Sequence, residues 1–368
     1  MMDSTKWNRQ DSTKKESIIR GSVMKMKRFV VQLSIFALLL SACSSNSANT
    51  TTSETGAAAP NEEPLKVALV LPEKIGVNPF FQQMDEGLKK AGEDFGLEVK
   101  TVEPTDINAI EENLRAFVAD DYDLIITSSF KAKDPLTKVA SENPDKPFVI
   151  IDTTVDLPNV RSNVFREHEA AFLVGALAGL STKTDKVGMV LAMDTVELSK
   201  WSVGFREGLQ YTNPDAEFFL NYVGSFTDPA KAKELAIAQF EKGADFINGA
   251  SAVGDLGIFE AAAEKGFYTS GQDIDHTPKD PEHIVTSQIK RTDKVVYDTV
   301  KQFVEGTFKT GVFDYGLEEG GVGVVFVTQD SESPLSPFIG QENVDKVKQI
   351  RDDIVSGKIK VTNPLEKN

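Results

Sequence analysis

The sequence predicts an α/β protein made of two successive doubly wound, Rossmann-like lobes. Short apolar runs suited to buried strands alternate with segments whose apolar residues recur at helical spacing, a pattern typical of parallel sheets covered by helices. The same pattern restarts after Arg166. Beyond a 42-residue leader, 326 residues remain, enough for two domains with a substantial core each.

The first lobe opens with an all-apolar run at 67–71, which suits a strand buried on both faces. Asn78 and Pro79 are an N-cap residue and a first-turn proline, so a helix should follow and end at Gly96. Its apolar face predicts core positions at Phe80, Phe81, Met84, Leu88, Ala91 and Phe95. The later elements of this lobe are predicted as strand 97–102, helix 107–119, strand 124–127, a helix capped by Asp134, and strand 148–151.

The second lobe follows the same order of elements. We expect a helix from 167 to 180, then strand 187–191, helix 200–211, strand 218–222, a helix capped by Asp228, strand 246–248, helix 256–265 and strand 268–270. After Asp275 come strand 284–287, helix 293–305 and a strand segment at 320–327. These are more elements than the sheet of the second lobe needs. The chain is therefore expected to cross back between the lobes.

These elements predict discontinuous lobes. The N-terminal lobe is expected to comprise 64–162 plus 276–308, and the C-terminal lobe 163–275 plus 309–345. Residues 346–368 should form a C-terminal helix and tail.

The N-terminus resembles a bacterial lipoprotein signal. Lys25, Lys27 and Arg28 precede an apolar run at 29–40 that is too short for a permanent membrane span, and small residues lead to Cys43, the only cysteine. We expect residues 1–42 to be a removed signal peptide, with Met24 and Met26 as alternative starts. Acylated Cys43 would then hold the protein on the extracytoplasmic face of the cell membrane.

Residues 43–63 are polar and of low complexity, so they predict a flexible tether between that anchor and the folded body. The alternative reading of the leader is an apolar helix of a cytosolic fold with a chance cysteine. The serine-rich stretch beginning at Ser44 argues against it.

Composition excludes several classes of function. The leader holds eight of the 40 basic and three of the 56 acidic residues, which leaves a formal charge of minus 21 and argues against nucleic acid. With one cysteine there is no internal disulfide. The three histidines, His168, His276 and His283, lack metal-ligand spacing, and no Gly-x-Ser-x-Gly elbow is present. We therefore expect neither an enzyme nor a cofactor.

Candidate ligand-binding residues follow the strands, because open α/β sheets bind ligands at the carboxyl ends of their strands. Asp152 and Asp273 follow buried strands without a capping role, and their carboxylates suit ligand hydroxyls. Lys290 is a candidate donor or a hinge salt-bridge partner. The aromatic candidates, each with core packing as its alternative, are Phe80, Phe81 and Trp201.

Longer motifs resemble the basic membrane protein family of lipoproteins. The similarity spans about 65 to 362, and the matching stretches are 161–175, 186–189, 204–208, 222–231, 243–245 and 286–291. The resemblance implies a type I periplasmic-binding-protein fold, with two lobes joined by three crossovers, that serves an ABC importer and its permease.

The same resemblance implies a small neutral ligand, a purine nucleoside. Carried onto this sequence, Phe226 would be an aromatic clamp, Asp152 and Asp273 ribose acceptors, Gly254 a close backbone approach, and Lys290 a ribose or base donor. One stretch departs from the family pattern. Residues 76–81, GVNPFF, are similar to ribose-type sugar-binding proteins. The alternatives are a sugar-binding receptor and a sensory or regulatory surface lipoprotein of the same family.

Overall fold

The computed structural model describes residues 63–106 and 108–366. All of them belong to the second of the two units into which the chain divides, Glu62–Asn368. The predicted signal peptide, the predicted acylation site Cys43 and most of the predicted tether lie outside the described residues. None of the helices in the described part is long and apolar enough to cross a membrane.

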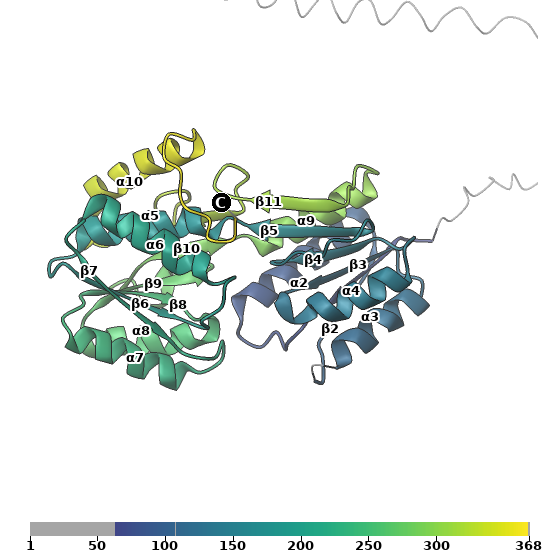
Figure 1. Ribbon diagram of the computed structural model, residues 1–368, viewed down its shortest axis with the longest axis horizontal. Helices are drawn as coiled ribbons and strands as arrows, with labels where there is room; N and C mark the ends of the chain where they lie inside the picture. The colour runs from purple at the N-terminus through teal and green to yellow at the C-terminus, as the bar shows by residue number, and fades with distance from the viewer. Residues whose placement is uncertain (1–62, 107, 367–368) are drawn as a thin grey trace, which may run out of the picture. The chain divides into compact units, whose positions relative to one another are not determined.

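The first lobe contains a six-stranded parallel sheet with the strand order β11-β5-β4-β3-β1-β2 (Figure 1). The strands are β1 (Lys66–Val70), β2 (Glu98–Val102), β3 (Leu124–Ser128), β4 (Phe148–Ile151), β5 (Val160–Phe165) and β11 (Gly311–Tyr315). The helices are α2 (Pro79–Phe95), α3 (Ala109–Ala119), α4 (Lys133–Glu142) and α9 (Thr292–Val304).

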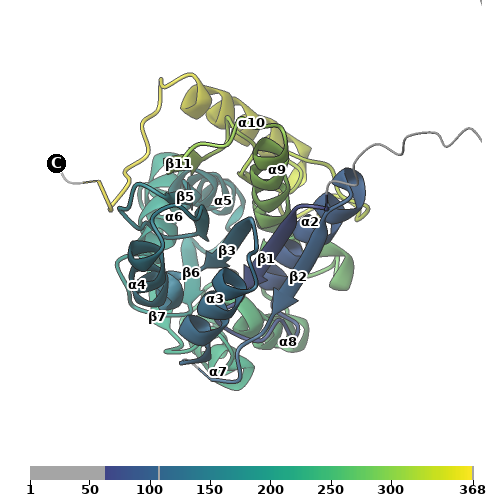
Figure 2. The same cartoon turned by 90° about the vertical axis from the view of Figure 1, so that its right-hand side faces the viewer.

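Both faces of this sheet are covered. Val67 and Leu69 of β1 pack in the same core as α2 and α9, whereas Ala68 and Val70 face the core formed with α3 and α4. Figure 2 shows α2 beside α9 and α3 beside α4. The alternation explains why β1 is apolar at every position from Val67 onward, since side chains of a strand point to alternate faces.

The second lobe repeats this arrangement with the strand order β12-β10-β9-β8-β6-β7. The strands are β6 (Lys186–Leu191), β7 (Glu217–Tyr222), β8 (Phe246–Ala250), β9 (Tyr268–Asp273), β10 (Ile284–Lys290) and β12 (Val322–Val324), and only β12 is antiparallel to its neighbour. Helices α5 (Glu167–Ser181), α6 (Ser199–Thr212) and α10 (Gly340–Val355) pack together, as do α7 (Pro229–Glu241) and α8 (Asp255–Lys265) on the other side (Figure 1).

The chain crosses between the lobes three times. The crossings fall between β5 and α5, between β10 and α9, and between β11 and β12. The predicted fold class, with its three crossovers, is confirmed.

The expected lobe boundaries are wrong at three strands. β5 extends the first lobe to Phe165, β10 belongs to the second sheet because it pairs in parallel with β9, and β11 belongs to the first sheet because it pairs with β5. The sheet to which each of these strands belongs is decided by backbone pairing with strands distant in the sequence. The local sequence pattern does not show this pairing. The C-terminal helix also starts earlier than expected, at Gly340.

Most of the predicted helix ends are confirmed. The Asn78 side chain accepts a hydrogen bond from the Phe80 amide (3.1 Å), and Gly96 ends α2 in the left-handed conformation at φ 66°. Asp228 caps α7 by accepting from the Lys231 amide at 2.9 Å. The predicted cap at Asp134 is wrong. A short 3-10 turn precedes α4, so its N-cap is Ala132 and Asp134 lies in the first turn.

Candidate ligand-binding site

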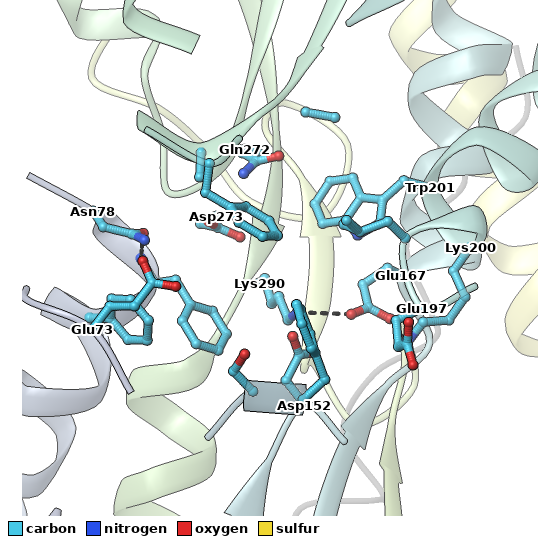
Figure 3. Close-up of a pocket in the computed structure, with 18 residues that line it drawn as sticks. Glu73, Asn78, Asp152, Glu167, Glu197, Lys200, Trp201, Gln272, Asp273 and Lys290 are labelled. Atoms are coloured by element: carbon cyan, nitrogen blue, oxygen red, sulfur yellow. Dashed lines mark hydrogen bonds and ion pairs between the residues drawn. The ribbon is translucent and has the colours of Figure 1, made fainter. Parts of the chain in front are cut away.

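A cavity lies between the lobes, at the carboxyl ends of strands from both sheets. The empty space between its walls is about 810 Å³, including the part open to solvent. Figure 3 shows the side chains of both lobes converging on this space.

Seven of the eight predicted ligand-binding residues line the cavity: Phe80, Phe81, Asp152, Trp201, Phe226, Asp273 and Lys290. Gly254 does not. It ends a short 3-10 turn, Ala252–Gly254, where a side chain would collide with Ser251, and Ala252 is the residue of this turn that lines the cavity. The compactness of this turn, not an approach to a ligand, explains its glycine.

Four cavity residues have backbone angles that L-residues rarely adopt. Asp152 directly follows β4 and has φ 73°, and Asp273 is the last residue of β9 and has φ 69°. Ser129 (φ 71°) and Ala252 (φ 56°) follow β3 and β8. By the strand orders, β4 corresponds to β9 and β3 corresponds to β8. Asp152 is therefore equivalent to Asp273 in the other lobe, and Ser129 is equivalent to Ala252. Such strained positions cluster at ligand sites, where the surrounding structure maintains them.

A charged cluster stands at the centre of the cavity (Figure 3). The Lys290 ammonium donates to Asp152 Oδ1 (2.5 Å) and to Glu167 Oε1 (2.8 Å). The second Glu167 oxygen lies 2.5 Å from the ammonium of Lys200. Glu167, Lys200 and Lys290 are almost fully buried, whereas 27% of the Asp152 side chain is exposed. Asp152 therefore keeps a face for a ligand.

The environment separates the pKa values of these carboxyls. Burial raises the pKa of Asp273 to about 7, and the carboxylates of Asp152 and Glu167 add to this, although Lys290 opposes it. Burial also raises the pKa of Asp152, against the pull of Lys290. For Glu167, burial acts in the same direction, but the ammonium groups of Lys200 and Lys290 outweigh it and hold the pKa at about 2.

Aromatic side chains line the remaining walls. Phe80 and Phe81 meet edge to face with ring centres 5.2 Å apart, and Trp201 is buried. Phe226, from the second lobe, lies 6.0 Å from the ammonium of Lys131, a first-lobe residue that pairs with Glu73 at 2.5 Å. The cavity thus combines flat apolar surfaces with hydrogen-bonding carboxylates. Among the described residues, no three potential metal-ligating side chains come together.

Several lining residues were not among the sequence candidates. They include two almost fully buried charged residues, Glu167 and Lys200, as well as Glu73, Ser129, Phe130, Glu197 and Gln272. Gln272 immediately precedes Asp273 at the end of a strand, so its position in the sequence carried a usable signal. Glu167 opens a helix after a strand that we did not predict.

Two α/β lobes with the same strand order, hinged by three crossovers around a polar and aromatic cavity, define a type I periplasmic-binding-protein-like solute receptor. The family described as ABC transporter substrate-binding protein PnrA-like matches residues 65–364, and the chain belongs to this family. The resemblance to basic membrane proteins is thereby confirmed. The family consists of substrate-binding proteins, not enzymes.

Individual relatives agree with this assignment. The chain is 28% identical over 366 residues to the ABC transporter nucleoside-binding protein BmpA of Lactococcus lactis, covering 91% of this chain and 99% of the relative. It is 32% identical over 257 residues to an uncharacterized lipoprotein of Pyrococcus abyssi, covering 64% of this chain and 63% of the relative. The crystal structure of a solute-binding protein of an Aeropyrum pernix ABC transporter system superposes with a TM-score of 0.72 at 29% identity, covering 82% and 94% of the two chains.

Membership in this family gives the chain a small-molecule ligand and an ABC permease as its partner. The lipoprotein names of relatives agree with an extracytoplasmic place at the membrane.

Proposed function

We propose that this protein binds a purine nucleoside in the cavity between its lobes and presents it to an ABC permease. The observation that carries the proposal is the division of the cavity into two kinds of surface. Asp152, Asp273 and Lys290 supply hydrogen-bonding groups, and Phe80, Phe226 and Trp201 supply flat apolar ones. A nucleoside likewise has one polar part, the ribose with its hydroxyls, and one flat, largely apolar part, the base.

Each half of the ligand has a matching physical interaction. Hydroxyls of the ribose donate to carboxylates, which are strong acceptors when ionised, and an ammonium donates in return. The base stacks on aromatic rings, a contact worth about 0.5–1.5 kcal/mol beyond the apolar area that it buries. The nucleoside-binding relative in Lactococcus lactis lends support to this assignment.

The charge of the cavity favours a nucleoside over a nucleotide. The lining holds five carboxyl groups, those of Glu73, Asp152, Glu167, Glu197 and Asp273, and two ammonium groups, those of Lys200 and Lys290, while Glu73 also pairs with the ammonium of Lys131. Both ammonium groups are already paired with carboxylates. A phosphate would meet an excess of negative charge in a site of low dielectric, so phosphorylated ligands should be rejected.

The binding step is closure of the two lobes on the ligand. Among the contacts that join the lobes beside the cavity, Lys290 donates to Asp152, Lys200 donates to the Phe165 carbonyl at 3.0 Å, and Gln83 of α2 donates to the Asp273 carbonyl at 3.3 Å. Contacts made only in the closed state supply the free energy of closure, and the permease then recognises the closed form.

We also propose that the protein is held at the membrane by acylation of Cys43. The apolar leader that precedes this cysteine supports the proposal. Metabolic labelling with palmitate should mark the protein and should fail to mark the Cys43→Ser variant. Labelling of that variant would show that the anchor lies elsewhere.

A sugar receptor is the second candidate, and residues 76–81 favour it because GVNPFF is similar to ribose-type sugar-binding proteins. A thermal-shift panel separates the two candidates, since a ligand that binds only the folded state raises the melting temperature. Purine nucleosides should raise it, and pentoses and hexoses should not. The opposite pattern would replace the nucleoside with a sugar.

A further inference from the structure

We infer that Glu167 and Lys200 are positioning residues that orient the Lys290 ammonium toward a hydroxyl of the bound nucleoside. This inference rests on the proposed function and adds a specificity device to it. It starts from the arrangement of three buried charged side chains on three separate elements: Glu167 opens α5, Lys200 lies in the first turn of α6, and Lys290 ends β10.

The donors of Lys290 are nearly all assigned. An ammonium carries three N–H groups, and here two of them donate, to Asp152 Oδ1 at 2.5 Å and to Glu167 Oε1 at 2.8 Å. The same nitrogen lies 5.1 Å from the centre of the Phe80 ring, which lines the cavity, and 4.9 Å from the centre of the buried Phe165 ring. The third N–H has no hydrogen-bond acceptor among the described residues, and the two carboxylates that hold the other N–H groups restrict its direction.

Lys200 fixes Glu167 in turn. Its ammonium lies 2.5 Å from Glu167 Oε2 and donates to the Phe165 carbonyl at 3.0 Å, at the end of a first-lobe strand. The Glu167 carbonyl also accepts from Gln288 at 3.2 Å, so both ends of the residue are held. With only 2% of its side chain exposed, Glu167 has little room to reorient.

The other lobe shows that this charged pair is not needed to dock the helices. By the shared strand order, β5 corresponds to β10 and α9 to α5, so Thr292 corresponds to Glu167. Thr292 joins α9 to α2 with a neutral hydrogen bond, from its hydroxyl to the Phe80 carbonyl at 3.0 Å. A hydroxyl meets the structural requirement there. The buried carboxylate and two ammonium groups in the second lobe therefore have a role beyond packing, since burying charge is costly.

Calorimetry with adenosine and its 2′-deoxy, 3′-deoxy and 5′-deoxy analogues tests this inference. Glu167→Gln keeps the volume of the side chain but removes its charge, and should weaken adenosine binding about tenfold or more. For the analogue that lacks the hydroxyl contacted by Lys290, the same substitution should change affinity by less than about threefold. A second variant, Lys200→Met, leaves Glu167 in place and should give the same dependence on the analogue.

Controls separate positioning from a loss of structure. Glu169→Gln changes a half-buried, ion-paired glutamate one half-turn along the same helix, which contacts Arg166 and the Leu317 amide but does not line the cavity. It should leave all four affinities unchanged. In a Lys290→Met background, Glu167→Gln should have no further effect on adenosine binding.

The outcomes are distinguishable from failure of the proposed function. If the unsubstituted protein binds no nucleoside, the proposed function is wrong. If it binds adenosine and Glu167→Gln weakens all four ligands equally, or weakens none, the positioning role is wrong while nucleoside binding stands.

Discussion

Asp152 and Asp273 occupy equivalent places in the two lobes and face one cavity. Each lies at the end of an equivalent strand, β4 or β9, and each has a positive φ, 73° and 69°. A glycine would adopt this conformation without strain, yet both positions hold an aspartate. The fold thus places one carboxylate from each lobe at the cavity, where closure on a single ligand brings both into use.

Substitution of Asp273 should weaken ligand binding. Asp273→Asn replaces a buried carboxyl acceptor with an amide and should weaken nucleoside binding by about 1–3 kcal/mol, as measured by calorimetry. Asp275→Asn, two residues further on and outside the cavity lining, is the matched control. An unchanged affinity for Asp273→Asn would remove this residue from the site.

The raised pKa of Asp273 predicts a pH-dependent cost to stability. Because burial raises its pKa to about 7 in the folded protein, the folded state keeps a proton between about pH 4 and pH 7 that the unfolded chain loses. The free energy of unfolding should therefore fall as pH rises through this window.

Asp273→Asn should abolish the part of this pH dependence of the free energy of unfolding that comes from Asp273. In the ligand-free protein at pH 8, this variant should be more stable than the unsubstituted protein by on the order of 1–3 kcal/mol, and at pH 4 the two should be equal. Urea unfolding at both pH values measures the difference. Buried His276, whose pKa burial lowers to about 4, contributes equally to both proteins and cancels. Equal stability at pH 8 would show that Asp273 ionises normally.

Phe226 should distinguish the base from the sugar. Phe226→Ala removes an aromatic surface of the second lobe and should weaken binding of a purine nucleoside by about 1–3 kcal/mol through lost burial and stacking. Surface plasmon resonance with adenosine measures this loss. If adenosine binding is unaffected, the base lies against another wall of the cavity.

Trp201 provides a built-in reporter of binding. The sequence has two tryptophans, Trp7 and Trp201, so a chain beginning at Ser44 contains only the second. Trp201 is 5% exposed and lines the cavity. A saturable change in tryptophan fluorescence should therefore accompany nucleoside titration and disappear in Trp201→Phe. A ligand that binds by calorimetry without changing this emission would lie away from Trp201.

The sequence was sufficient for the residues that follow apolar strands. Asp152 and Asp273 come directly after or at the end of buried runs, and the rule that ligands bind at the carboxyl ends of strands located both. The helix caps at Asn78 and Asp228 were likewise readable, because a cap depends on neighbours within three residues.

The missed features depend on distant partners. β5 has the sequence VRSNVF, and its buried Arg161 is hydrogen-bonded to Asn163, Gln302 and Tyr315. Without those partners the polar run does not look like a buried strand. Because β5 was missed, Glu167, which opens the next helix, was not recognised as a cavity residue. β11 was missed for a related reason, since its largely exposed residues at the sheet edge lack an apolar pattern.

Isothermal titration calorimetry of the chain beginning at Ser44, with purine nucleosides and with ribose and hexoses, tests the central claim most directly. We expect a purine nucleoside to bind one to one with a dissociation constant in the micromolar range or tighter, about −8 kcal/mol or more favourable, and the free sugars to give no heat. Binding of a sugar with no response to any nucleoside would contradict the account.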